Sequence, residues 1–202
     1  MISLLIYIKH RFPWLWSIVE WLNGRLFAMI YPKFFDGVHE VLSSCHNEKI
    51  SPSIITHGDI AGLEKLWKNQ SAQYLSYFEP HPFDEKTLNR LLKNKSFAMM
   101  KMTDNTNGRI IGYFFLRCFF TGKAFHGLMV DEHYNNHGIG MTMWALSAQI
   151  CNKVGMRIFA TVSEHNFASI ASARKATEVI VVDKLANDYL LIECRPKAKY
   201  YG

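Results

Sequence analysis

The 202-residue sequence predicts an α/β (α+β) fold, with a mixed central sheet, flanking helices and an apolar helical arm in front of them. Hydrophobic residues make up 49% of the chain, which suffices for the core of one domain of ordinary size. From about residue 51 onward, short apolar strand-like runs alternate with segments at helical spacing. We therefore divide the chain into an arm, residues 1–50, and a domain, residues 51–202.

The arm carries a helix-like pattern that is apolar on more than one side. Pro13 can occupy the first turn of this helix. Trp14 and Trp21 lie off the main apolar stripe, so the helix requires burial on more than one face. The pattern is too interrupted for a transmembrane span. The main stripe consists of Leu15, Ile18, Val19, Leu22, Leu26, Met29 and Ile30.

Two kinds of partner remain open for this arm. It can pack on the domain or on a second copy of the chain, which would give a homodimer. Alternatively, residues 1–35 make peripheral contact with a membrane surface, through their tryptophans and through Lys9, Arg11 and Lys33.

The domain is predicted to begin with helices and to continue with a hairpin. Asp59 and Asp84 each stand where they can cap a following apolar helix. Residues 104–108 form a turn-rich loop between two strands. The predicted order is strand 53–56, helix 60–67, loop 74–83, helix 85–92, strands 97–102, 110–117 and 124–130, helix 139–154, strand 157–162, helix 166–175, and strands 179–182 and 189–194.

The net charge and the cysteine content indicate which classes of ligand and which cellular compartment the protein suits. The net charge of +6 and a pI near 9.1 favour anionic ligands, such as coenzyme A or nucleotide sugars, and anionic membranes. Because the basic residues are scattered, we do not expect a nucleic-acid partner. The four cysteines lie far apart, and the N-terminus lacks a convincing signal peptide. These features predict a reduced, cytoplasmic protein, with membrane association as the alternative.

The most informative stretch is the turn that ends in Gly138-Ile139-Gly140 and leads into the apolar run 141–154. Glycines let the backbone approach a ligand closely. The helix that follows leaves N–H groups unpaired at its positive end, which suits a phosphate or pyrophosphate. The third glycine of the dinucleotide-binding fingerprint is missing, because Met143 occupies that position.

Residues 135–140, which read Asn-Asn-His-Gly-Ile-Gly, resemble motif A of the GCN5-related N-acetyltransferases, whose loop reads Arg/Gln-x-x-Gly-x-Gly/Ala. Asn135 departs from the first position of that motif. The resemblance extends over residues 54–194 and implies acetyl-CoA as the cosubstrate. It also implies a splayed strand pair, with the pantetheine arm of the cosubstrate between the strands. The implied contacts are the backbone groups of Met129 and Val130 for pantetheine, and the amides of His137, Gly138, Ile139, Gly140 and Met141 for the pyrophosphate.

The catalytic groups usual in this family are absent. Ala124 occupies the position of a glutamate base, and Ala173 occupies that of a tyrosine acid. His126 follows on the same strand face as Ala124 and is our predicted base; the alternative is a packed strand histidine that is hydrogen-bonded to a neighbour. Asn166 matches the first residue of the family's helix motif and is assigned to catalysis and cofactor binding; the alternative is an ordinary helix cap.

The loop of residues 74–83 lies where the family binds its acceptor. Tyr77, Glu79 and His81 are therefore predicted to contact a polar amine, although a loop pinned by its aromatic rings is the alternative. His133 and His137 stand in a turn rather than on one helix face, so we expect no metal site.

We therefore predict an acetyl-CoA-dependent N-acetyltransferase that moves an acetyl group directly to a primary amine. The expected acceptor is small and polar, and an amino sugar on a nucleotide is attractive. Two enzymatic alternatives are a protein N-acetyltransferase and an acyltransferase for longer chains. Because the usual glutamate and tyrosine are missing, a non-catalytic acyl-CoA-binding scaffold is a third alternative.

Overall fold

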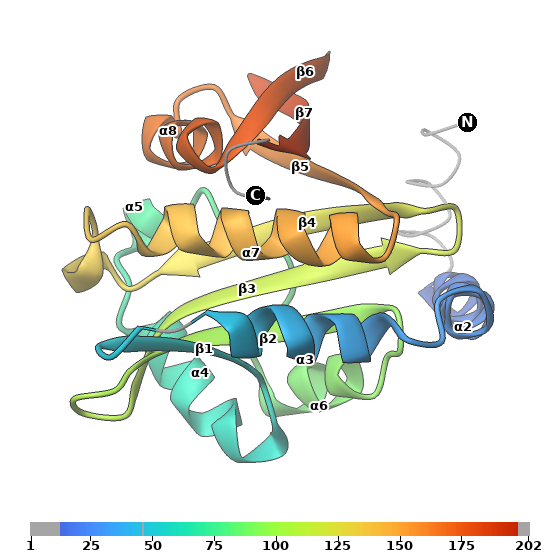
Figure 1. The fold of residues 1–202 in the computed structure, drawn as a ribbon, viewed down its shortest axis with the longest axis horizontal. Helices are drawn as coiled ribbons and strands as arrows, with labels where there is room; N and C mark the ends of the chain where they lie inside the picture. Colours follow the sequence, from blue (N-terminus) through green and yellow to red (C-terminus); the bar gives the residue numbers. More distant parts are fainter. Residues whose placement is uncertain (1–12, 46, 198–202) are drawn as a thin grey trace.

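The computed structural model describes residues 13–45 and 47–197, and side chains from residue 18 onward. One mixed sheet of seven strands runs in the order β1-β2-β3-β4-β5-β7-β6 (Figure 1). All neighbours are antiparallel except β4 and β5, which are parallel. The strands are β1 Ile50–Ile54, β2 Phe97–Asp104, β3 Arg109–Phe119, β4 Lys123–Val130, β5 Arg157–Ser163, β6 Thr177–Leu185 and β7 Tyr189–Pro196.

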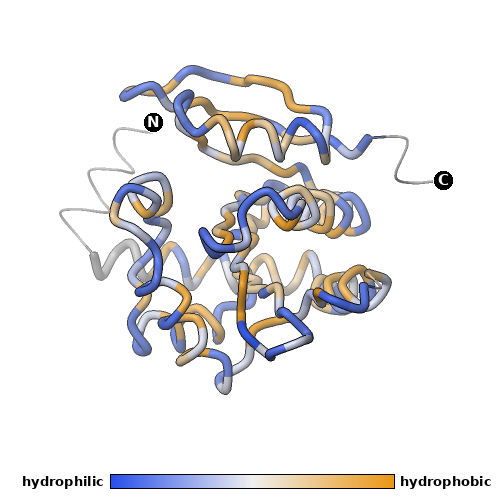
Figure 2. Tube along the Cα trace, turned by 90° about the vertical axis from the view of Figure 1, so that its left-hand side faces the viewer, coloured by the Kyte–Doolittle hydropathy of each residue, from blue (hydrophilic) through white to orange (hydrophobic). Residues whose placement is uncertain are grey.

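Helices cover both faces of the sheet. On one face, α3, α7 and α8 pack over a core that extends across most of the strands. On the other face, α4 and α6 pack over β2 and β3 around a smaller aromatic core. Apolar segments lie between these layers, as Figure 2 shows. The helices are α2 Pro13–Ile30, α3 Phe34–Ser44, α4 Ile60–Lys68, α5 Ala72–Leu75, α6 Glu85–Leu92, α7 Ile139–Lys153 and α8 Phe167–Ala176, with short 3-10 turns at His57–Asp59 and Glu132–Tyr134.

The prediction of a mixed sheet with a splayed pair is confirmed. Strands β4 and β5 pair at only three positions, from Lys123–Arg157 to Phe125–Phe159. Beyond these pairs β5 diverges from β4, as its path in Figure 1 shows. The remaining length of β4 therefore faces a gap in the sheet.

The arm contains one helix more than predicted. Besides α2, residues 34–44 form α3, which buries Phe34, Val38, Val41 and Leu42 in the main core. Part of the arm is thus built into the same core as the sheet. Among the described residues, no helix is long and apolar enough to cross a membrane.

The first strand begins and ends earlier than predicted, at Ile50–Ile54 rather than 53–56. Pro52 lies within it, although proline cannot donate a ladder hydrogen bond. The strand tolerates this residue because β1 is an edge strand, paired only with β2.

The cysteines of the described chain are free thiols. Cys118, Cys151 and Cys194 are buried, and Cys45, at the end of α3, is half-buried.

Candidate functional site

The gap between β4 and β5 leaves backbone groups of β4 without a strand partner. The N–H of Asp131 donates to the carbonyl of Ile111 in β3 at 2.8 Å. Because amides alternate in direction along a strand, the N–H groups of Leu128 and Val130 point the other way, into the gap. No pairing with β5 extends past Phe125. The gap can therefore accept an extended chain that pairs with β4 as a strand would.

One side chain already reaches into this gap. The hydroxyl of Tyr74, in α5, accepts a hydrogen bond from the N–H of Val130 at 3.1 Å. Burial is the main cause that raises the pKa of Tyr74 above its ordinary value, so the phenol stays protonated at neutral pH. No local sequence pattern indicates this contact, because the two residues are 56 positions apart.

A hydrogen-bonded clamp holds α5 beside the gap. The carboxylate of Glu132 accepts from the N–H and the hydroxyl of Ser71, both at 2.7 Å. The N–H of Glu132 in turn donates to the side-chain oxygen of Gln70 at 2.9 Å. The bond from the Ser71 amide is the main cause that lowers the pKa of Glu132. This clamp joins the start of α5 to the turn after β4.

The turn before α7 has the geometry of an anion cradle. Gly138 caps α7 with a φ of +79°, in the left-handed region that favours glycine, and a Cβ there would meet nothing within 4 Å. The first α7 amide with a helical partner is that of Thr142, which donates to the carbonyl of Gly138 at 3.0 Å. Within the described chain, no acceptor is present for the amides of His137, Gly138, Ile139, Gly140 and Met141.

The cradle adjoins the gap. A Cβ on Gly140 would lie 3.9 Å from a methyl group of Val130, the last residue of β4. A phosphate on the cradle would therefore place an attached arm at the open edge of β4. Unpaired amides, a helix N-terminus and no acidic residue in the first turn of α7 fit the pyrophosphate of coenzyme A.

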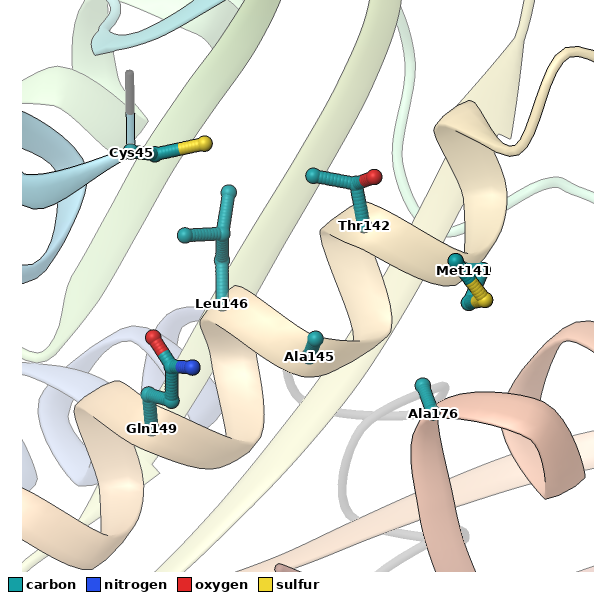
Figure 3. Close-up of a pocket in the computed structure, with 7 residues that line it drawn as sticks. All are labelled: Cys45, Met141, Thr142, Ala145, Leu146, Gln149 and Ala176. Carbon is teal, nitrogen blue, oxygen red and sulfur yellow. The ribbon is translucent and has the colours of Figure 1, made fainter. Parts of the chain in front are cut away.

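A groove of about 220 Å³ starts at the first turn of α7 (Figure 3). Its floor is a stripe of α7, and its two ends are marked by Cys45 after α3 and Ala176 at the end of α8. Because Met141 both lines the groove and supplies the last amide of the cradle, the groove continues from the cradle along the outside of α7. The α7 residues in the groove are Met141, Thr142, Ala145, Leu146 and Gln149.

His126 lies away from the gap, which argues against the predicted role as base. Its side chain is 5% exposed and sits on the α7 face of the sheet, with its ring 4.2 Å from that of Trp144. Among the residues that the structure describes, neither ring nitrogen has a hydrogen-bond partner. Burial lowers the pKa of His126 to about 3, so the ring stays neutral at physiological pH. The packing agrees with the alternative of a packed strand histidine, but the hydrogen bond to a neighbour that this alternative expects is not found among the described residues.

Asn166 caps α8: its side-chain oxygen accepts from the N–H of Ser169 at 3.0 Å. Its assignment to catalysis and cofactor binding stays a prediction, which would use the amide group that the cap leaves free.

The three residues predicted to contact the acceptor differ in their exposure to solvent. Tyr77 and Glu79 are exposed on the loop between α5 and α6. His81 instead turns inward, and its Nε2 lies 2.8 Å from the hydroxyl of Tyr113. Burial is the main cause that lowers the pKa of His81. The loop is therefore pinned by His81 and offers Tyr77 and Glu79 to solvent.

An aromatic wall closes the sheet on the acceptor-loop side of the gap. A Cβ on Gly127 would lie 2.4 Å from Phe115 and 3.3 Å from Phe78, so only glycine fits there. Next to it, the rings of Phe125 and Phe159 stack at 5.9 Å.

An ion pair that no sequence pattern indicated lies beside this wall; its carboxylate is buried, and its guanidinium side chain is 58% exposed. Glu193 pairs with Arg157 through two bonds of 2.9 and 2.6 Å, and this pairing is the main cause that lowers the pKa of Glu193. Glu193 is the cross-strand partner of Phe159, so the two side chains share one face of the sheet. Only the alternation of side chains along β7 could have indicated this placement.

Comparison with known proteins identifies the family. A family model described as "Acetyltransferase (GNAT) family" matches residues 63–176, more than half of the chain. Among curated proteins, none matches the chain by sequence.

Solved structures are similar in fold at low sequence identity. A ribosomal-protein-S5-alanine acetyltransferase from Vibrio fischeri has 15% identity and a TM-score of 0.64, covering 77% of this chain and 97% of that one. A spermidine N-acetyltransferase chimera from Vibrio cholerae has 14% identity and a TM-score of 0.59, covering 77% and 99%. A ribosomal L7/L12 α-N-protein acetyltransferase in complex with coenzyme A has 14% identity and a TM-score of 0.61, covering 74% and 95%.

Proposed function

Because the chain belongs to the acetyltransferase (GNAT) family, whose members use acetyl-CoA, we propose that it acetylates the primary amine of a small polar acceptor. The observation that carries the site is the row of unpaired amides from His137 to Met141, next to the open edge of β4. The proposed acceptor is an amino sugar carried on a nucleotide, which the net charge of +6 supports.

The bound cosubstrate would supply an acetyl group activated as a thioester. The amides of the cradle would hold its pyrophosphate, and the groove along α7 would take the nucleoside beyond it. The amides of Leu128 and Val130 would pair with the arm in the gap. Preorganised backbone donors of this kind position a substrate without changing charge themselves.

The acceptor would approach from the loop of residues 74–83. Glu79 is exposed there and can hold the ammonium form of an amine, while Tyr77 offers a ring and a hydroxyl. The amine must lose a proton before it attacks the thioester carbon. Since His126 is buried, we assign it no part in this step. Tyr77 and Glu79 keep their predicted roles as acceptor contacts.

Thiol release from acetyl-CoA tests this proposal with three acceptors: a nucleotide-linked amino sugar, spermidine and a peptide with a free N-terminus. We expect the highest kcat/KM with the amino sugar, and inhibition by the same nucleotide without the amine. A higher kcat/KM with the peptide would show that the acceptor proposal is wrong. Tight binding of acetyl-CoA without release of thiol on any amine would favour the scaffold alternative.

A further inference from the structure

Exposed apolar side chains gather on α2. Of the twelve large hydrophobic side chains that are exposed in the described part of the chain, seven belong to this helix. Met29 is 77% exposed and Trp21 is 59% exposed. A contiguous apolar surface of this kind marks an interaction site. We call it the α2 patch; its members are Ile18, Val19, Trp21, Leu22, Leu26, Met29 and Ile30, with Phe120 beside them after β3.

The α2 patch is held firmly against the domain. The side chain of Asn23 donates to the carbonyl of Cys118 at 2.9 Å and accepts from the N–H of Phe120 at 3.2 Å. The same side chain donates to the hydroxyl of Ser96 at 3.1 Å. Phe27 on the inner face is fully buried. The patch is therefore a built surface of the domain.

A cavity of about 310 Å³ opens beneath the patch, between α2 and the end of β3. Arg117 stands in its wall, 5.5 Å from the ring centre of Phe97, and no carboxylate of the described residues lies within 4.0 Å of its guanidinium. Glu20 is the one acidic side chain among the described lining residues. The full lining is Val19, Glu20, Leu22, Asn23, Leu26, Asn94, Ser96, Arg117, Phe119 and Phe120.

Exposed basic residues adjoin the cavity lining and the patch along the chain. Lys93 and Lys95 flank the lining residue Asn94, and both are exposed. On α2, the guanidinium of Arg25 lies 5.3 Å from the ring centre of Trp21, and Lys33 follows the helix. An apolar surface with basic residues around it fits an anionic bilayer, where apolar side chains enter the interface and cations meet head groups.

We propose that the α2 patch docks on an anionic lipid surface, with one negatively charged head group in the Arg117 cavity. A second copy of the chain fits less well, because a two-fold interface brings identical patches together. Arg25, Lys33, Lys93 and Lys95 of both copies would then be gathered into one interface. This docking does not depend on the proposed acceptor.

Vesicle co-sedimentation of the full chain tests the apolar part of this surface. Vesicles of phosphatidylcholine alone are compared with vesicles that also contain phosphatidylglycerol. We expect binding to be at least about tenfold stronger with the anionic lipid, since each basic residue near the surface contributes about 1 kcal/mol. Met29→Ser and Trp21→Ser should each weaken binding severalfold, whereas Phe167→Ser, an exposed position on α8, should leave it unchanged.

The head-group contact is tested with Arg117→Gln, which should reduce the preference for phosphatidylglycerol, and with Arg174→Gln on α8 as its control. Calorimetry should give the same affinity for acetyl-CoA in every variant as in the wild type. A loss of lipid binding can then be distinguished from a loss of cosubstrate binding. The proposal is overturned if the wild type ignores both vesicles or if Met29→Ser and Trp21→Ser bind like the wild type. It is also overturned if the wild type forms dimers that these two variants abolish while vesicle binding is unchanged.

Discussion

The hydroxyl of Tyr74 accepts a hydrogen bond from the backbone N–H of Val130 at 3.1 Å, inside the gap between β4 and β5. This is one of the amides that the family resemblance assigns to the pantetheine arm. The clamp from Glu132 to Ser71 holds α5 in place, so the hydroxyl stands there before any cosubstrate binds. In the proposed binding mode, the arm and the Tyr74 hydroxyl would therefore compete for the same donor.

Tyr74→Phe removes this competition. A hydrogen bond of this kind contributes about 0.5–1.5 kcal/mol net, so the variant should bind acetyl-CoA about 2- to 10-fold more tightly. Calorimetry measures the Kd, and Tyr77→Phe, an exposed tyrosine three residues along, is the control. Weaker binding by Tyr74→Phe would mean that the hydroxyl contacts the cosubstrate instead.

Gly138→Asp should abolish measurable acetyl-CoA binding, because a side chain and a negative charge enter the phosphate cradle. Gly155→Asp is the matched control: its φ of +70° is close to the +79° of Gly138, and open space surrounds both. The two variants should lose similar stability in urea unfolding. Equal affinity for acetyl-CoA in both would remove the cradle from the binding site.

His126→Leu should keep the acetyltransferase rate between pH 6 and 9 and should change the pH dependence of stability. The folded pKa of about 3 lies below the unfolded value of about 6.5, so the unfolded chain binds more protons between these values. Wild-type stability is therefore fully present above pH 6.5 and falls as the pH drops. Between pH 7 and pH 5 this group should cost about 2 kcal/mol.

Urea unfolding of both proteins at pH 7 and pH 5 measures this difference. The loss on acidification should be smaller in His126→Leu by that amount. If the leucine variant instead lost activity while it kept its fold, His126 would regain its role as base.

Asn23→Ala should lower the free energy of unfolding by about 2–3 kcal/mol, because three hydrogen bonds from α2, to Ser96, Cys118 and Phe120, are lost. Asn152→Ala, at an exposed position late in α7, should stay within about 0.5 kcal/mol of the wild type. Chemical denaturation gives both values. If Asn23→Ala lost no more unfolding free energy than Asn152→Ala, these hydrogen bonds of α2 would contribute little to the stability of the fold.

Local patterns predicted much of the domain. The hairpin of β2 and β3, strand β4 and helix α7 follow from apolar runs bounded by turn residues, and the cradle follows from two glycines at a helix start. The second arm helix, α3, was missed although Phe34, Val38 and Val41 share one helical face. Lys33 precedes α3, and its side chain makes no capping hydrogen bond. The sequence therefore contains no helix-capping residue that would indicate where α3 begins.

The rest of the site depends on contacts between distant residues. Strand alternation correctly placed His126 on the face of Ala124, but it could not tell that this face packs on Trp144 of α7. Likewise, no spacing relates Tyr74 to Val130, because the clamp at Glu132 sets the position of α5. The order of the helices and strands could therefore be predicted from the sequence, whereas the surroundings of these side chains could not.

The open edge of β4 has a consequence for selectivity. In the proposed binding mode, main-chain donors at Leu128 and Val130 would recognise the spacing of amide groups along the bound arm and would not sense the acyl group at its end. We therefore expect discrimination between an acetyl group and a longer acyl group to depend on the rings crowded around Gly127. Because the ring of Phe115 lies against Gly127, we expect a bulky acyl chain to fit there only if the side chain of Phe78 changes its rotamer.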